Sequence, residues 1–412
     1  MSGPRIDPVR VLADLRELAA LTGGPDGARR VCWTEEWRVA REFLRRLLGE
    51  LGLEPRRDEA GNLWAQLDGE DPAAPAVAVG SHIDSVPSGG WLDGALGVLT
   101  AVGVLRAWAD SGRRPPRTLV LVDFADEEGA RFGRSLFGSS AVAGTLDPAA
   151  VAALRDRDGT PIADALAENG IDLERAPLAA ARRERLGAFL ELHIEQGPVL
   201  EAEGLAVAAV DGCAGVERHR FTFSGQASHA GTTPMDARRD AGLAAADAAL
   251  RIERLPRRAG GVATTGALAL EPGIPTAVAG RATLTVDLRN PEREALAAML
   301  AGARAAATSA AAPRGCEVAE EPIWSIEPVP FDPGLVSAAR AACAAVSGAE
   351  RTLTSGALHD AAELARTVPT AMVFCSSRAG ISHAPEEDTP ESDVIAGIEA
   401  FGRLANATLV SA

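Results

Sequence analysis

Histidine and carboxylate side chains follow apolar runs of this sequence at positions where they could hold a metal ion. His82 and Asp84 come directly after the apolar run 75–80, and Asp93 lies in the glycine-rich segment beyond them. Asp84 could fix the tautomer of a metal-bound His82 imidazole, although a His-x-Asp pair at a strand end more often makes ordinary hydrogen bonds. Asp93 could equally cap the helix expected after it. Metal-dependent hydrolysis is therefore the first chemistry that the sequence indicates.

Further candidates follow other apolar runs. Glu127 and Glu128 are adjacent carboxylates, which repel each other unless a cation or solvent lies between them. His193 and His383 also follow apolar segments, and each of them alone could be structural. Taken together, three histidines, one aspartate and one glutamate supply ligands for two divalent cations, with Asp93 as the bridge and Glu127 free to act as general base.

The composition narrows the class of protein. The chain has 412 residues and a net charge of -16, which argues against nucleic acid and anionic membranes as partners. It contains no lysine and no tyrosine, so a Schiff-base lysine and a tyrosyl acid are excluded. We expect no apolar run long enough for a membrane helix, and the N-terminus lacks a secretion pattern, so a cytoplasmic protein is expected. The scattered cysteines are expected to be small buried hydrophobes.

Alternating strands and helices predict an α/β protein with an open mixed sheet, helices on both faces and a site along the carboxyl edge of the sheet. We expect helices within 8–49 and at 94–108, 333–346 and 391–409, and strands at 75–80, 117–124, 188–193 and 370–375. These elements form the predicted metal-binding catalytic domain, which consists of residues 1–210 and 326–412.

Residues 211–325 show a different order of elements. Strands are expected at 218–223, 261–270, 281–288 and 316–324, and helices at 236–255 and 291–308. The order βαββαβ predicts an inserted α+β domain of the ferredoxin-like type. We expect this domain to serve as a lid or dimerisation domain.

Several motifs distributed along the chain form a specific set. Residues 127–133 read Glu-Glu-Gly-x-Arg-Phe-Gly, and residues 193–201 read His-Ile-Glu-Gln-Gly-Pro-Val-Leu-Glu. With the segments 80–97, 126–144, 228–240, 355–361 and 382–387, they make the sequence resemble the family of N-carbamoyl-L-amino-acid hydrolases and allantoate amidohydrolases. Members of that family are binuclear metal-dependent amidohydrolases related to aminoacylases and zinc carboxypeptidases. The resemblance covers almost the whole chain.

The resemblance implies a role for each metal-site residue. One metal ion would be held by His82, Asp93 and His193, and the other by Asp93, Glu128 and His383, with Glu127 activating water. A histidine at position 193, where peptidase relatives usually carry a carboxylate, favours the amidohydrolase branch. Zinc, manganese, cobalt and nickel all suit such a set of imidazoles and carboxylates.

Substrate contacts are also implied by the resemblance. His229 resembles the histidine that stabilises the oxyanion across a dimer interface, which implies a homodimer. Arg289 resembles the residue that grips the substrate carboxylate, and Gln196 resembles a substrate-contacting amide. Thr276 stands where relatives usually have asparagine. His359 could contact the substrate or support a ligand.

The expected reaction is hydrolysis of the carbamoyl amide of an N-carbamoyl-L-amino acid or a similar small ureido acid. The nearest rival is an allantoate amidohydrolase, which the same motifs would serve. A dipeptidase or N-acyl-amino-acid deacylase comes next. A catalytically silent binding protein that keeps the same fold is a rival of a different class.

Overall fold

The computed structural model describes residues 3–410, which divide into two compact units. The first unit contains the chain up to Gly212 and from Pro330 onward, and the second unit contains Cys213–Val329. Each unit has its own hydrophobic core. The predicted α/β class with a large mixed sheet is confirmed.

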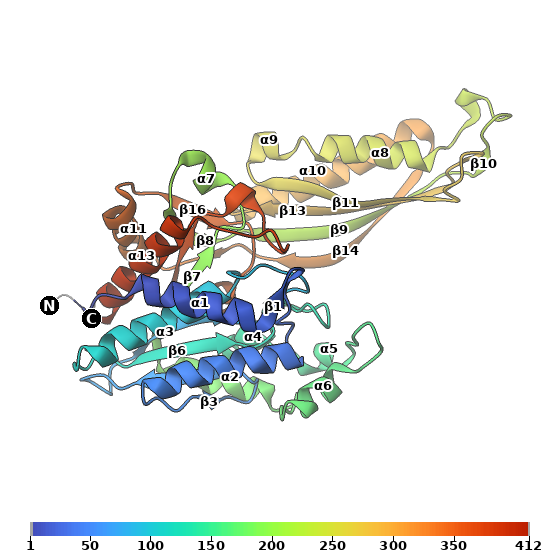
Figure 1. The fold of residues 1–412 in the computed structure, drawn as a ribbon. Coiled ribbons are helices and arrows are strands. Elements are labelled where there is room, and N and C mark those ends of the chain that lie inside the picture. The colour runs from blue at the N-terminus through green and yellow to red at the C-terminus, as the bar shows by residue number, and fades with distance from the viewer. Residues whose placement is uncertain (1–2, 411–412) are drawn as a thin grey trace. The chain divides into compact units, whose positions relative to one another are not determined.

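The helices and strands of the first unit alternate along much of the chain (Figure 1). The α-helices are α1 (Pro8–Thr22), α2 (Glu35–Glu50), α3 (Ala95–Asp110), α4 (Phe137–Ala143), α5 (Pro148–Ala152), α6 (Ile162–Glu168), α7 (Val199–Glu203), α11 (Pro333–Ser347), α12 (Asp360–Leu364) and α13 (Glu391–Val410). The strands are β1 (Gly23–Gly24), β2 (Gly27–Ala28), β3 (Arg56–Arg57), β4 (Leu63–Leu67), β5 (Ala76–His82), β6 (Leu119–Phe124), β7 (Leu186–Ile194), β8 (Val207–Cys213), β15 (Val329–Pro330), β16 (Thr352–Ser355) and β17 (Thr370–Cys375). Two 3-10 helices, η1 (Ala176–Arg185) and η4 (Arg378–Gly380), also belong to this part of the fold.

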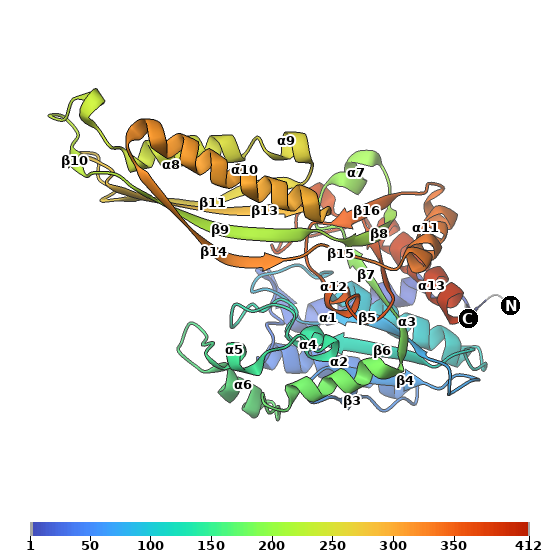
Figure 2. The ribbon, with the colours of Figure 1, turned by 180° about the vertical axis from the view of Figure 1, so that it is seen from behind.

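The main sheet of the first unit has nine strands in the order β15-β8-β17-β7-β5-β6-β4-β3, with β16 beside β8. The central strands β17, β7, β5 and β6 are parallel to their neighbours in this group. Strand β8 is antiparallel to β17, β4 is antiparallel to β6, and β3 is antiparallel to β4. Every residue of β5 and β6 is buried, as expected for strands covered on both faces. Helices α1, α3, α11 and α13 form a layer on one face, and α4 and α12 lie on the other (Figures 1 and 2).

The second unit is a four-stranded antiparallel sheet with two long helices on one face. In chain order its elements are β9 (Gly215–Ser224), β10 (Ser228–His229), η2 (Met235–Ala237), α8 (Ala241–Ile252), α9 (Pro256–Ala259), β11 (Val262–Glu271), β12 (Ala277–Val278), β13 (Arg281–Asn290), α10 (Arg293–Ala311), η3 (Ala312–Arg314) and β14 (Glu317–Ile326). The sheet order is β11-β13-β9-β14. The core side chains Phe221, Phe223 and Leu284 pack beneath α8 and α10.

Two expectations from the sequence were wrong in this unit. The helix expected from residue 236 begins at Ala241, because the Asp240 side chain accepts a hydrogen bond from Leu243 N (3.0 Å) and caps it there. Within residues 3–410, the stretch Arg293–Arg314 is long and apolar enough to span a membrane by length and composition, although no such run was expected. Its buried face, which includes Met299, packs in the core of the unit, and this packing accounts for its apolar character.

Candidate metal centre

Four neighbouring strands of the first unit bring the predicted metal-site residues to one edge of the sheet. Strands β17, β7, β5 and β6 are adjacent and parallel, so their carboxyl ends meet at that edge. His82 is the last residue of β5, and His193 is the last but one of β7. Glu127 and Glu128 follow β6, and His383 follows β17. The topology therefore gathers residues that lie far apart in the sequence.

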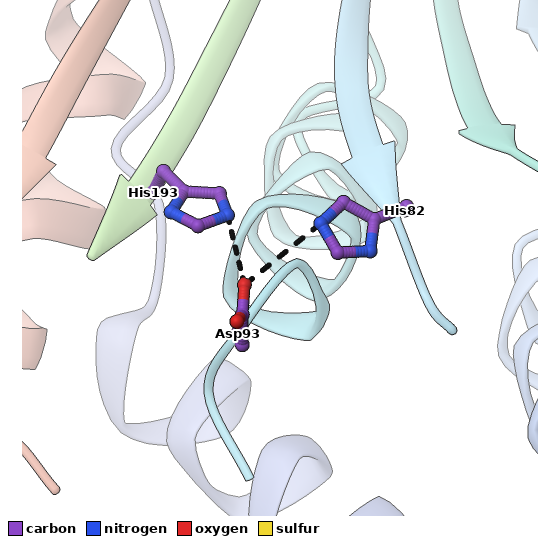
Figure 3. Close-up of side chains that lie close together, drawn as sticks. All are labelled: His82, Asp93 and His193. Atoms are coloured by element: carbon purple, nitrogen blue, oxygen red, sulfur yellow. Dashed lines mark ion pairs between the residues drawn. The ribbon is translucent and has the colours of Figure 1, made fainter. Parts of the chain in front are cut away.

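Asp93 faces two imidazoles through one of its carboxylate oxygens (Figure 3). Asp93 Oδ1 lies 3.1 Å from His193 Nε2 and 3.9 Å from His82 Nε2. The Nδ1 atoms of these histidines contact backbone carbonyls, of Asp84 for His82 (3.2 Å) and of Ile194 for His193 (2.9 Å). Because a carbonyl only accepts hydrogen bonds, each Nδ1 carries a proton, and in a neutral ring Nε2 is left as a lone-pair donor.

The other oxygen of Asp93 faces a second group. Asp93 Oδ2 lies 3.3 Å from His383 Nε2, which is 3.5 Å from Glu128 Oε2. His383 is about half exposed, whereas Asp93 and Glu128 are largely shielded from solvent. Asp93 therefore presents one oxygen to each of two adjacent ligand sets, which is the arrangement of a bridging carboxylate.

These residues fit divalent metal ions. In each of the sets His82/Asp93/His193 and Asp93/Glu128/His383, one potential ligand atom per residue lies within 4.8 Å of the others. Among the described residues, Glu128 Oε1 is buried without a hydrogen-bond partner, and the neighbour of His193 Nε2 is the Asp93 carboxylate at 3.1 Å. A buried oxygen atom of this kind is unfavourable unless something coordinates it, and a cation would satisfy it.

Asp84 contacts both the backbone of the Glu127–Glu128 pair and the imidazole of His82. Its Oδ1 and Oδ2 atoms accept hydrogen bonds from the backbone N–H groups of Glu127 and Glu128, each at 3.3 Å. Its Oδ1 atom lies 3.6 Å from His82 Nδ1, which is farther than the Asp84 carbonyl. The carboxylate thus holds the backbone that carries both glutamates, and the Asp84 carbonyl orients the imidazole.

Buried carboxylates are concentrated at this site, and their pKa values are shifted. Burial, followed by the carboxylates of Asp360 and Glu128, raises the pKa of Glu127 well above its usual value. Burial and then the charge of Asp93 raise the pKa of Glu128 to about 8. Burial opposes ionisation of Asp93, but His193 and His383 outweigh it and hold the pKa of Asp93 well below its usual value. Clustered buried carboxylates of this kind are stabilised by bound cations.

His359 and Gln196 both lie beside the cluster. The His359 ring is buried, its centroid is 4.4 Å from that of His193, and its Nε2 lies 2.9 Å from Ser355 Oγ. Gln196 Nε2 donates to Asp93 Oδ2 (3.0 Å). The contact of Gln196 in this structure is therefore to the bridging carboxylate. Contact of either residue with a substrate stays a prediction.

His229 and Thr276 belong to the second unit, where they lie together. Strands β10 and β12 pair so that His229 is opposite Ala277, the neighbour of Thr276. Both His229 and Thr276 are exposed. His229 Nδ1 accepts hydrogen bonds from Gly231 N (3.0 Å) and Thr232 N (3.2 Å), so the neutral ring carries its proton on Nε2.

Arg289, also in the second unit, is oriented by an acid two residues away on β13. Its Nε donates to Asp287 Oδ1 (2.8 Å) and its Nη2 to Asp287 Oδ2 (3.3 Å). Arg218 Nη2 donates to the same Asp287 Oδ2 (2.7 Å). Two guanidinium groups thus share one carboxylate on the sheet.

Comparison with known proteins identifies the family. The model of Peptidase family M20/M25/M40 matches residues 78–407. The chain belongs to this family. The part of the chain that matches includes every residue of both candidate ligand sets.

Proteins similar to this chain include named amidohydrolases. The N-carbamoyl-L-amino acid amidohydrolase of Geobacillus stearothermophilus is 38% identical over 392 residues, covering 95% of this chain and 96% of that protein. The allantoate amidohydrolase of Bacillus subtilis (strain 168) is 32% identical over 382 residues, covering 92% of each protein. The crystal structure of an amidase of the hydantoinase/carbamoylase family from Burkholderia multivorans has a TM-score of 0.88 and 35% identity, covering 99% of both chains. The resemblance inferred from the motifs is confirmed.

The sequence did not indicate every residue at the site of this M20 family member. Glu387, in the acidic run Glu386-Glu387-Asp388, is buried and accepts a hydrogen bond from Asp93 N (3.1 Å). Arg30 is fully buried, and its Nε donates to the Ile83 carbonyl (2.8 Å). Residue type does not distinguish a buried charge from an exposed one, so nothing in the sequence indicated Arg30, and Glu387 was indicated only as the last residue of the motif segment 382–387.

Proposed function

We propose that this protein is a binuclear metal-dependent amidohydrolase that cleaves the carbamoyl amide of an N-carbamoyl-L-amino acid. The overall reaction, R–NH–CO–NH2 + H2O → R–NH2 + CO2 + NH3, releases an L-amino acid. The observation that carries the proposal is the position of Asp93, whose two oxygens face two sets of potential metal ligands beside Glu127. The names of the relatives supply the substrate class.

Two divalent ions per subunit, zinc, manganese, cobalt or nickel, suit these donors. His82 and His193 would hold one ion, Glu128 and His383 would hold the other, and Asp93 would bridge them. When bound, such ions lower the pKa of water and polarise a carbonyl.

Glu127 is the proposed general base. Its side chain is buried, its Oε2 lies 3.7 Å from His82 Nε2, and its position is set by the Asp84 hydrogen bond to its backbone N–H. A carboxylate whose proton affinity is raised by burial can accept a proton from water and then deliver it to the leaving nitrogen. Glu127 would therefore act twice in one turnover.

The second unit is proposed to bind the rest of the substrate. Its order of elements, βαββαβ, and its antiparallel sheet support a ferredoxin-like lid and dimerisation domain. The guanidinium group of Arg289, which lies beside that of Arg218, suits a substrate carboxylate. The Nε2–H group of His229 suits an oxyanion. Thr276 and Gln196 are proposed as further substrate contacts. Motion of this unit as a lid would close the site and exclude water, and a homodimer is proposed as the assembly.

Allantoate is the main alternative substrate, because an allantoate amidohydrolase matches nearly the whole of this chain. A dipeptidase or N-acyl-amino-acid deacylase follows, and a silent binding protein is disfavoured by the intact Glu127 and ligand sets. A cytoplasmic location stays a prediction.

A substrate panel tests the proposal. Metal-stripped protein reloaded with each ion would be incubated with N-carbamoyl amino acids, 3-ureidopropionate, allantoate and dipeptides, and ammonia and amino acid would be measured. We expect ammonia and L-amino acid in equal amounts from an N-carbamoyl amino acid. Faster ammonia release from allantoate would favour that substrate instead, and dipeptide cleavage without ammonia would contradict the ureido specificity.

A further inference from the structure

Glu387 lies in the turn after His383 and reaches back to the loop that carries Asp93. We propose that Glu387 is a positioning residue. It would fix the position of the bridging Asp93 relative to the loop that carries His383, so that both metal ions can bind. This inference rests on the metal centre proposed above.

The two carboxylate oxygens of Glu387 accept hydrogen bonds from different loops. Oε1 accepts hydrogen bonds from the backbone N–H groups of Asp93 (3.1 Å) and Leu92 (3.3 Å). Oε2 accepts a hydrogen bond from Ser382 Oγ (2.7 Å), which is adjacent to His383 in the chain. One carboxylate therefore ties together two loops that are nearly 300 residues apart in the sequence.

The hydrogen bonds continue into a closed ring. Ser382 has one hydroxyl proton, and its shortest acceptor is Glu387 Oε2. Ser382 Oγ then accepts from Gln196 Nε2 (3.1 Å), and the same amide donates to Asp93 Oδ2 (3.0 Å). The ring begins at the Asp93 backbone and returns to the Asp93 side chain, so it restrains both the position and the rotation of the bridging carboxylate.

The local sequence makes room for this buried acid. Glu387 is 2% exposed, whereas its neighbour Glu386 is exposed. A Cβ atom at Gly90 would collide with the Glu387 side chain, so the glycine permits the close approach. Burial of a carboxylate is unfavourable unless it is hydrogen-bonded, and the three donors named above supply that compensation.

Cobalt titration of the metal-free full chain tests the inference. Binding of Co²⁺ would be followed by its visible absorption and by chelator competition, with folding checked by circular dichroism. We expect Glu387→Ala to weaken binding of at least one of the two Co²⁺ ions by roughly 10- to 100-fold, as for other residues that support metal ligands. Glu387→Gln can still accept from Asp93 N and donate to Ser382, so it should restore most of the affinity. The matched control Glu386→Ala should bind like the unmodified protein.

Gly90→Ala is a second test variant, because its added Cβ atom would displace the Glu387 side chain without removing the carboxylate. If Glu387→Ala does not fold, the Co²⁺ affinity of Gly90→Ala tests the inference instead. Weaker binding in Gly90→Ala supports the inference. Two Co²⁺ ions bound with unchanged constants by folded Glu387→Ala or Gly90→Ala would overturn it while leaving the metal centre intact. Failure of the unmodified protein to bind two Co²⁺ ions would overturn both proposals.

Discussion

In the first unit, His82, Asp93 and His193 are 1%, 3% and 1% exposed, whereas His229 and Thr276 in the second unit are exposed to solvent. The first group shows shifted pKa values that arise from burial and from neighbouring charges. This contrast indicates different roles for the two units. Buried groups can hold ions and move protons, because a low dielectric strengthens their interactions, while exposed groups contribute smaller increments of binding energy.

Replacement of Glu127 should produce the largest effect. We expect Glu127→Gln to lower kcat by about 10²- to 10⁴-fold, which is the usual contribution of a general acid-base, while both metal ions remain bound. Ammonia release and elemental analysis would measure the two quantities. Glu36→Gln, which changes an exposed acid on α2, is the control. A loss of kcat smaller than tenfold would remove Glu127 from the role of base.

Replacement of Arg289 tests the second unit. Hydrogen bonds to charged groups contribute about 1.5–3 kcal/mol, so Arg289→Met should raise KM for an N-carbamoyl amino acid roughly 10- to 150-fold, with a smaller change in kcat. Arg220→Met is a matched control on β9, where Arg220 pairs with Glu321. If both variants behave alike, the effect is one of general charge and Arg289 does not bind the substrate carboxylate.

Metal affinity should depend on pH because the buried site of the first unit holds protons when no metal is bound. Glu128 has a pKa of about 8, raised by burial and then by Asp93. The pKa values of His193 and His383 are both about 9, because the Asp93 carboxylate outweighs the opposing effect of burial. At pH 7 these groups are protonated, and a metal ion must displace the protons. Affinity for Co²⁺ should therefore rise as the pH increases from 6 to 9.

The expected slope is about tenfold per pH unit for each proton displaced. Chelator competition, corrected for protonation of the chelator, would measure it. A constant affinity between pH 6 and 9 would show that the site binds metal without releasing protons, which would contradict the raised pKa values.

The smallest predicted effect concerns Thr276. A side-chain amide offers a further hydrogen bond, and one such bond contributes about 1 kcal/mol. Thr276→Asn should therefore lower KM roughly fivefold, while Thr265→Asn, at an exposed position on β11, should leave it unchanged. An unchanged or higher KM for Thr276→Asn would indicate that position 276 does not contact the substrate.

Much of the fold could be predicted because the local patterns are strong. The continuous apolar runs predicted β5, β6, β7 and β17 to within a few residues, and the helices α1 and α13 followed from the spacing of their apolar residues. Strands β4 and β8 were missed. They are antiparallel additions to the sheet whose identity depends on their partners β6 and β17, and pairing partners cannot be read from a local pattern.

The sequence by itself determined which residues could bind metal, that they follow strand ends, and to which family the chain belongs. Only the tertiary structure decided that Asp93 presents separate oxygens to His193 and His383, that Asp84 carries the backbone of the glutamate pair, and that Glu387 is buried. The physical reason is that residue type and spacing define donors and acceptors, whereas burial and hydrogen-bond partners arise from segments that meet only when the sheet is assembled.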